Sequence, residues 1–305
     1  MNTSLQTPLQ VQRIQAVDLT VADGDRSIDF YTAALGFTVI SDQTVEARYN
    51  ARPGHPSSRV RIITLQLGNE HIRLMQYLDI HSRPIPPDSQ SNDLWFQHLA
   101  IVVSDMGRAY AHLQSVSFEP ISTTPQTIPP GNKEAAYIQA FKFKDPDCHP
   151  LELIWFPSDK GQAKWHQKNN QLFLGIDHTA IAVANTEQSL QFYCDRLGMQ
   201  IDGGSFNWRE TQARMDGLPD AKVRITALRP IQGGLGIELL DYIEPANGRP
   251  IPSDLNDYDI ANTQIELAID DARLDQWYPI KDPTGHSLLL RPTMYSANRN
   301  FDSNK

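Results

Sequence analysis

The sequence predicts an α+β fold built from four copies of one strand–helix–strand module. The first reason is a repeat of half the chain: VADGDRSIDFYTAALGF at 21–37 returns as VANTEQSLQFYCDRLGM at 183–199, and RPIPPD at 83–88 returns as RPIPSD at 249–254. The second reason is a finer repeat inside each half. Four strand-like stretches alternate small and apolar residues and close on Asp or Asn, and they begin modules one to four at 15–23, 97–105, 177–185 and 263–271.

Local signals justify the elements that follow these first strands. The closing Asp or Asn suits the N-cap of a helix. Apolar stripes then predict helices in modules one and three, each ending at Leu-Gly, which is typical of a helix C-cap (Ile28, Tyr31 and Leu35; Leu190, Tyr193 and Leu197). Further strands are predicted after these helices, at 60–67, 71–77, 223–230 and 236–242.

Composition excludes several classes of protein. With 305 residues, 40% hydrophobic and 21% charged, the chain is globular and large enough for two domains of about 150 residues each. A net charge of −9 without any Lys/Arg cluster argues against nucleic-acid binding. No apolar run approaches the roughly 20 residues of a membrane span, and the N-terminus does not resemble a signal peptide. We therefore expect no membrane partner and a cytoplasmic location.

The repeat also sets the predicted domain boundaries. Residues 1–156 form the first domain with modules one and two, 157–172 form a polar linker, and 173–305 form the second domain with modules three and four. Module four is truncated. Gln264 lies 166 residues after its counterpart His98, whereas His286 lies only 137 residues after His149, so 29 residues are missing between them.

The modules, together with HPLELIWF at 149–156, resemble the βαβββ module of the vicinal oxygen chelate superfamily. That superfamily includes glyoxalase I, methylmalonyl-CoA epimerase, fosfomycin-resistance enzymes, bleomycin-sequestering proteins and extradiol dioxygenases. The resemblance covers nearly the whole chain outside the linker and the tails. It implies four βαβββ modules forming two curved mixed-sheet cups, the fourth module being truncated, with a divalent metal ion in the hollow of a cup.

The resemblance further implies where the metal ligands lie. One comes from the first strand, seven residues before its closing residue, and one from the middle of the last strand. Modules two and three carry a full set at these positions, the predicted metal ligands His98, Glu152, His178 and Glu238. Modules one and four carry no usable set: Ala16, Arg73, Gln264 and Leu289. We therefore predict that module two pairs with module three, leaving modules one and four as a remnant without a catalytic site.

Strand alternation supports this set independently of the resemblance. Small residues share a strand face with each histidine and leave room beside the imidazole: Ala100 and Val102 with His98, Ala180 and Ala182 with His178. A lone acid such as Glu152 between buried apolar residues is costly unless it is paired or bound to a metal. Two imidazoles and two carboxylates suit Fe, Ni, Co, Zn or Mn, and the choice among these metals stays open.

Three functions compete at this point. The leading hypothesis is a metal-dependent lyase or isomerase of the glyoxalase or epimerase type, acting on a small oxygen-chelating substrate through a metal-stabilised enediolate. In it Glu152 or Glu238 is the catalytic base as well as a ligand. The alternative is an Fe(II) extradiol-type ring-cleaving dioxygenase using His98, His178 and one Glu. The third is a resistance-type protein that binds a small molecule without catalysis. A homodimer is compatible with each hypothesis, and no organic cofactor is expected.

Other motifs are interpreted as structural. His149 and His286 lie in DPxxH turns before the last strands and are taken as turn residues. The two RPIPxD segments are taken as rigid connections between modules, with an Arg that binds an anion at the rim of the cup as the alternative.

Overall fold

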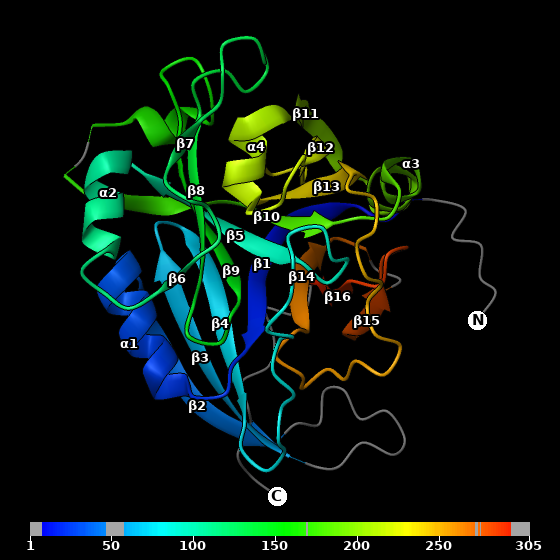
Figure 1. Ribbon diagram of the computed structural model, residues 1–305. Coiled ribbons are helices and arrows are strands. Elements are labelled where there is room, and N and C mark those ends of the chain that lie inside the picture. Colours follow the sequence, from blue (N-terminus) through cyan, green and yellow to red (C-terminus); the bar gives the residue numbers. More distant parts are fainter. Residues whose placement is uncertain (1–7, 47–57, 169, 272–273, 275, 294–305) are drawn as a thin grey trace, which may run out of the picture.

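The computed structural model describes residues 8–46, 58–168, 170–271, 274 and 276–293. The first residues of the first predicted domain, 1–7, and the last of the second, 294–305, therefore lie outside the described residues. Within the described part of the chain the strands form two mixed sheets, and α-helices lie against them (Figure 1). This arrangement confirms the predicted α+β fold class.

The first sheet joins modules one and four. Its strands run in the order β15 (Tyr278–Lys281), β16 (Ser287–Pro292), β14 (Thr263–Ile269), β1 (Val11–Thr20), β4 (Glu70–Tyr77), β3 (Arg59–Leu67) and β2 (Thr38–Glu46). The seam is the antiparallel pair of β1 and β14. The described part of module four has three strands and no helix, as its shortened sequence predicts.

The second sheet joins modules two and three. Its order is β11 (Gln200–Asn207), β12 (Lys222–Arg229), β13 (Gly236–Glu244), β10 (Phe173–Ala182), β5 (Gln97–Val103), β9 (Pro150–Trp155), β8 (Gln139–Lys144) and β6 (Glu119–Pro120), with β7 (Gln126–Thr127) paired to β8. Antiparallel pairing of β5 with β10 forms the seam, which confirms the predicted pairing of modules. Each sheet thus takes strands from both halves of the sequence, and the division at 157–172 stays a prediction.

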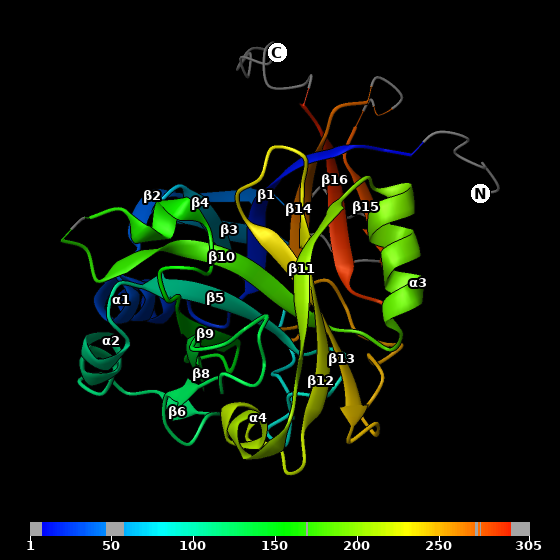
Figure 2. The same cartoon turned by 90° about the horizontal axis from the view of Figure 1, so that it is seen from above.

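The helices begin and end where the caps predict. In α1 (Gly24–Leu35) the Asp23 side chain accepts hydrogen bonds from two backbone N–H groups of the first turn, and Gly36 closes the helix at φ 71°. In α3 (Thr186–Leu190), which continues as the π-helical segment η2 (Gln191–Arg196), Asn185 is the N-cap. Helix α2 (Met106–Leu113) starts on Asp105 in the same way. Seen from above, α1 and α2 lie on one side of the molecule and α3 on the other (Figure 2).

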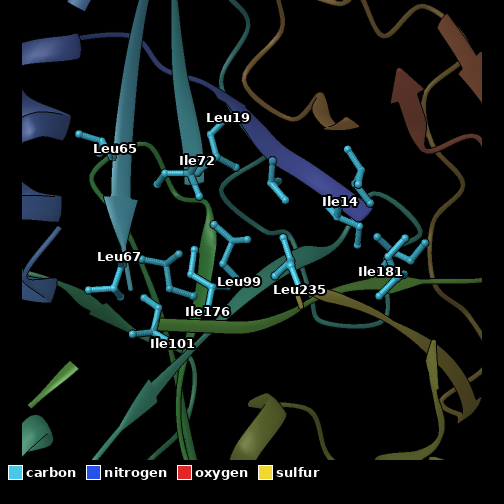
Figure 3. Close-up of a cluster of buried hydrophobic side chains, with 14 of the residues drawn as sticks. Ile14, Leu19, Leu65, Leu67, Ile72, Leu99, Ile101, Ile176, Ile181 and Leu235 are labelled. Atoms are coloured by element: carbon cyan, nitrogen blue, oxygen red, sulfur yellow. The ribbon is translucent and has the colours of Figure 1, made fainter. Parts of the chain in front are cut away.

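One continuous apolar core unites the two sheets and these helices. Leu65 and Ile72 of the first sheet and Leu99 and Ile101 of the second belong to it, and all four are almost completely buried (Figure 3). Because neighbouring residues of a strand face opposite ways, the side chains before and after Leu99 point away from this core. That outer, concave face of the second sheet is the cup in which the candidate site lies.

Sequence patterns did not predict helix α4 (Arg209–Asp216), which lies between β11 and β12 in this cup. Its side chains Met215 and, just beyond the helix, Leu218 pack against Ala140 and Ala180 on the concave face. The helix therefore closes one end of the cup. The linker closes another, because Trp165 in the 3-10 helix η1 (Ala163–His166) packs on Ala100.

The RPIPxD segments connect the two halves of the chain through reciprocal ion pairs, in which the arginine of each half binds aspartates of the other half. Arg83 donates to Asp254 and to the buried Asp259 of the second half, at 2.7 and 2.6 Å. In return, Arg249 donates to two aspartates of the first half, Asp88 at 2.9 Å and the buried Asp93 at 2.7 Å. These contacts confirm the interpretation of both segments as connections between modules.

Candidate metal centre

Four adjacent strands each bring one predicted ligand into the cup. His98 lies on β5, Glu152 on β9, His178 on β10 and Glu238 on β13. The register places an alanine beside each of them on the neighbouring strand, since Ala100 pairs with both His178 and Glu152, while Ala180 pairs with both His98 and Glu238. These alanines leave space on the concave face beside the two imidazoles and the two carboxylates.

The distances within this cluster suit a single cation. His98 Nε2 lies 3.2 Å from Glu152 Oε2, and His178 Nε2 lies 3.7 Å from the same oxygen and 3.4 Å from Glu238 Oε2. Two donor atoms on one ion cannot be farther apart than two metal–ligand bonds, about 4.2 Å. One ligand atom each from His98, Glu152 and His178 lies within 4.8 Å of the other two, so a bound ion would require the three side chains to close by only a few tenths of an ångström. The structure thus brings three of the predicted ligands together, His98, Glu152 and His178, and places the fourth, Glu238, beside His178.

The imidazoles are buried with unused nitrogen atoms. Nδ1 of His98 has no partner among the described residues, and Nε2 of His98 and of His178 face carboxylate oxygens at 3.2–3.7 Å without the geometry of a hydrogen bond. A buried polar atom without a partner costs about 1–3 kcal/mol, so several at one point indicate that a ligand belongs there. Glu238 keeps 22% of its side chain exposed, against 7% for Glu152, and so lies nearest the opening of the cup.

Charge leads to the same conclusion. Buried Lys142 faces Asp216 at 2.6 Å, and Arg229 faces Asp177 at 2.8 Å, so these two pairs are balanced. Glu152 and Glu238 add two negative charges, and among the described residues their ion-pair partners are the two histidines and no Lys or Arg. A divalent cation supplies the missing two positive charges, and this donor set fits it.

Burial and these carboxylates shift the pKa values in opposite directions. Burial lowers the pKa of His98 to about 4, despite the attraction of Glu152. Burial also disfavours the charged form of His178, but Glu238, Asp177 and Glu152 raise its pKa to about 10. Burial raises the pKa of Glu238. The pKa of Glu152 lies well below its usual range, because His98, His178 and Lys142 outweigh its burial. Without a cation, a proton on His178 thus compensates the carboxylates in part.

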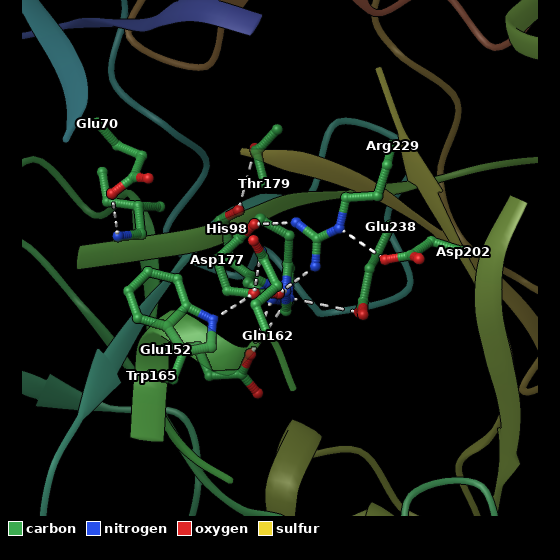
Figure 4. Close-up of polar contacts among 12 residues, drawn as sticks. Glu70, His98, Glu152, Gln162, Trp165, Asp177, Thr179, Asp202, Arg229 and Glu238 are labelled. Carbon is green, nitrogen blue, oxygen red and sulfur yellow. Dashed lines mark hydrogen bonds and ion pairs between the residues drawn. The ribbon is translucent and has the colours of Figure 1, made fainter. Parts of the chain in front are cut away.

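Asp177 orients His178, a contact that sequence reasoning missed. Its carboxylate accepts from His178 Nδ1 at 3.1 Å and from Arg229 Nη2 at 2.8 Å. The linker adds two more donors, Trp165 Nε1 at 2.8 Å and Gln162 Nε2 at 2.9 Å (Figure 4). With Nδ1 held by Asp177, His178 presents Nε2 to the cluster, as metal-binding histidines commonly do. A register shift of β10 between Ile176 and His178 lets the adjacent Asp177 reach the imidazole.

The equivalent place in the first sheet holds an ion-pair network instead. Arg73 binds Asp18 at 2.7 Å and also Glu266, which Arg291 contacts at 2.9 Å. A guanidinium thus provides the positive charge between buried carboxylates that a cation would provide. Among the described residues, His98, Glu152 and His178 form the one group of three side chains close enough to share an ion.

The DPxxH histidines take no part in the cluster. His149 is held between Asp145, at 3.0 Å, and the Ile260 carbonyl, at 3.1 Å. His286 contacts the Ala182 carbonyl at 2.7 Å. Both are buried turn residues, in agreement with the interpretation of the sequence.

Comparisons with known proteins agree with this architecture. A family model described as the Glyoxalase/Bleomycin resistance protein/Dioxygenase superfamily matches residues 13–153 and 175–266. Glyoxalase I from Zea mays is 15% identical, with a TM-score of 0.58 and 91% of each chain covered. A candidate dioxygenase from Bacillus subtilis subsp. subtilis str. 168 is 11% identical, with a TM-score of 0.54 and coverage of 93% of this chain and 86% of the other. No curated protein matches the sequence significantly. At these identities the two structures show a shared fold.

Proposed function

Because the chain belongs to the Glyoxalase/Bleomycin resistance protein/Dioxygenase superfamily, we propose that it is a divalent-metal-dependent enzyme of the glyoxalase or epimerase type. The observation that carries the proposal is the set of buried imidazole nitrogens of His98 and His178 that face two carboxylates without forming hydrogen bonds. His98, Glu152, His178 and Glu238 would hold the ion. The proposed substrate is a small molecule with two adjacent oxygen atoms, one of them a carbonyl or hydroxyl next to an acidic C–H bond.

The two carboxylates differ in position, and we assign them different roles. Glu152 lies deepest, between His98 and His178, and serves as a permanent ligand. Glu238 is the more exposed acid and contacts His178 alone of the two imidazoles, so it serves as the catalytic base. A bound divalent cation supplies a Lewis acid that polarises neighbouring substrate oxygens. Glu238 takes the proton from the carbon beside the carbonyl. It returns the proton to the adjacent carbon in a glyoxalase-type isomerisation, or to the same carbon in an epimerisation.

A second candidate is an Fe(II) dioxygenase, and one observation favours it. His98, Glu152 and His178 alone form a close set of two histidines and one carboxylate, the same ligand types as in the facial triad of non-haem iron oxygenases. In that case Glu238 would contact substrate rather than the ion. Non-catalytic binding of a small molecule is the outcome if neither reaction occurs.

The experiment that separates these candidates begins with metal analysis of the purified protein. Protein loaded with Ni, Co, Zn, Mn or Fe is then incubated in D2O with 2-hydroxycarbonyl compounds and with adducts of 2-oxoaldehydes and thiols. Deuterium at the carbon beside the carbonyl supports the glyoxalase or epimerase type, whereas oxygen uptake with catechols supports the dioxygenase. Glu238→Gln should keep the ion and lose the exchange, and Gln264→Ala serves as the matched control. Protein that binds none of these metals would refute the proposal.

The cellular location and the oligomeric state complete the proposal. A cytoplasmic location and a homodimeric state stay predictions, to be tested by fractionation and by sedimentation. In the part of the chain that the structure describes, no helix is long and apolar enough to cross a membrane.

A further inference from the structure

A second cavity of about 250 Å³ lies beside the start of α4, between that helix, the end of β11 and the loop at 128–132. Its walls include Ile128, Pro129 and Trp208 and two amide side chains, Asn207 and Gln212. Both amides are almost completely buried, with 5% and 3% of their surface exposed. Buried amides are normally fully hydrogen-bonded, so the state of each polar atom here is informative.

Neighbouring groups determine which amide atoms are free. Asn132 Nδ2 donates to the Phe206 carbonyl and to Asn207 Oδ1, which fixes Oδ1 as the acceptor and leaves Asn207 Nδ2 as an unused donor. Gln212 Nε2 donates to the Asp216 carboxylate at 2.6 Å, which leaves Gln212 Oε1 as an unused acceptor. Asp216 is itself held by Lys142 and by the Tyr242 hydroxyl, so Gln212 cannot turn over without losing a charged partner.

The cavity therefore offers one free donor, one free acceptor and an aromatic wall. Neither Asn207 Nδ2 nor Gln212 Oε1 has a partner among the described residues. Both side chains are buried and line this cavity, so the cavity is the space from which a ligand can reach them. The Trp208 ring is tilted by 35° to Phe206, with centroids 5.6 Å apart. Arg209 also borders the cavity, but it is exposed and lies 5.8 Å from the Trp208 ring centre. An apolar pocket with a few convergent polar groups is typical of a small-molecule site.

We propose that this cavity binds a flat, uncharged group that carries one carbonyl and one N–H, such as an aromatic carboxamide or a lactam. The carbonyl accepts from Asn207 Nδ2, the N–H donates to Gln212 Oε1, and the flat face packs on Trp208. A charged carboxylate lacks the donor that Gln212 needs, and a ketone lacks it as well. A site built to hydrogen-bond both groups discriminates strongly against ligands that leave one buried amide unpaired.

The test uses benzamide as the probe, with benzoate and acetophenone as matched compounds that lack the N–H. Binding is followed on the Trp208 indole signal in 1H–15N spectra, assigned with Trp208→Phe. We expect benzamide to shift this signal saturably, with at least tenfold weaker binding of the other two compounds. Asn207→Asp keeps the acceptor for Asn132 and removes the free donor, and should weaken benzamide binding at least tenfold. Gln200→Glu, an exposed residue on the same strand, makes the same charge change and should have no effect.

Three results would overturn the proposal: no saturable shift in the wild type, equal binding of all three compounds, or tighter binding of benzoate. The wild-type comparison decides the question even if Asn207→Asp fails to fold. The titration is run on metal-loaded and on chelator-treated protein. Protein without any metal affinity that still binds benzamide refutes the proposed function alone, and metal-binding protein that ignores benzamide refutes this pocket alone.

Discussion

Replacing His178 with alanine isolates the role of the metal cluster from that of the fold. A four-ligand zinc site is worth about 10–16 kcal/mol, so one ligand of four accounts for roughly 3–4 kcal/mol. At about 1.4 kcal/mol for each factor of ten, metal affinity should fall on the order of 10²–10³-fold. Ala180 and Ala182 lie beside His178 on the same face of the strand, so small side chains are already accommodated there. His178→Ala should therefore leave the sheet intact.

Calorimetric metal titration and thermal unfolding together test this expectation. An ion present at about 100 times its Kd stabilises the folded state by roughly 2.7 kcal/mol, and the variant should lose that contribution at the same metal concentration. In chelator the two melting temperatures should approach each other. Gln264→Ala is the control, since it occupies the equivalent position in module four and pairs in register with Asp18. If that control lost the metal while His178→Ala kept it, the assignment of the functional cup would be wrong.

Three further substitutions probe the surroundings of the cluster. Asp177→Asn should lower metal affinity by about 10–100-fold in the same titration, while the circular dichroism spectrum stays unchanged; unaltered affinity would contradict the orienting role. Asp145 holds the pKa of His149 above its ordinary value although burial opposes this, so His149 contributes stability below about pH 6.5 that is lost as the pH rises through its folded pKa. His149→Gln should flatten that decline in urea unfolding between pH 6 and 9, and a wild-type stability that rises over this range would refute the reasoning. Glu266→Gln leaves Arg73 partly uncompensated, and we expect a loss of about 3–5 kcal/mol in unfolding free energy with unchanged metal content; a lost metal would contradict a purely structural network.

Internal repetition explains why so much of the cluster could be predicted from the sequence. Equivalent positions in repeated modules occupy equivalent places in a sheet, so His98 and His178 could be compared directly with Ala16 and Gln264. The shortened fourth module then decided which strands complete a cup. No pattern of a single strand carries this information, because it depends on the partner strand.

The features that could not be predicted depend on tertiary contacts. Helix α4 reads RETQARMD, in which Met215 is the only large apolar residue. Its buried polar residues Gln212 and Asp216 are stabilised by Lys142 and Tyr242 from distant strands. Because side chains alternate along a strand, the sequence places Asp177 on the opposite face of β10 from His178. The register shift that brings the Asp177 carboxylate to the imidazole arises where β10 pairs with β5. The composition of the linker likewise gives no indication that Trp165 completes the surroundings of Asp177.

The exchange of arginine and aspartate between the RPIPxD segments has a consequence for how the chain can be divided. Two identical half-length chains would make both contacts at once, each arginine held by the other copy, and would meet at the same seams. The covalent connection is then dispensable in principle. Fragments 1–172 and 173–305, produced as separate polypeptides, should associate as a heterodimer and recover metal binding, whereas each fragment alone should bind none. Arg83→Ala should weaken the association of the two fragments with each other. Metal binding by the mixture would then depend on the fragment concentration.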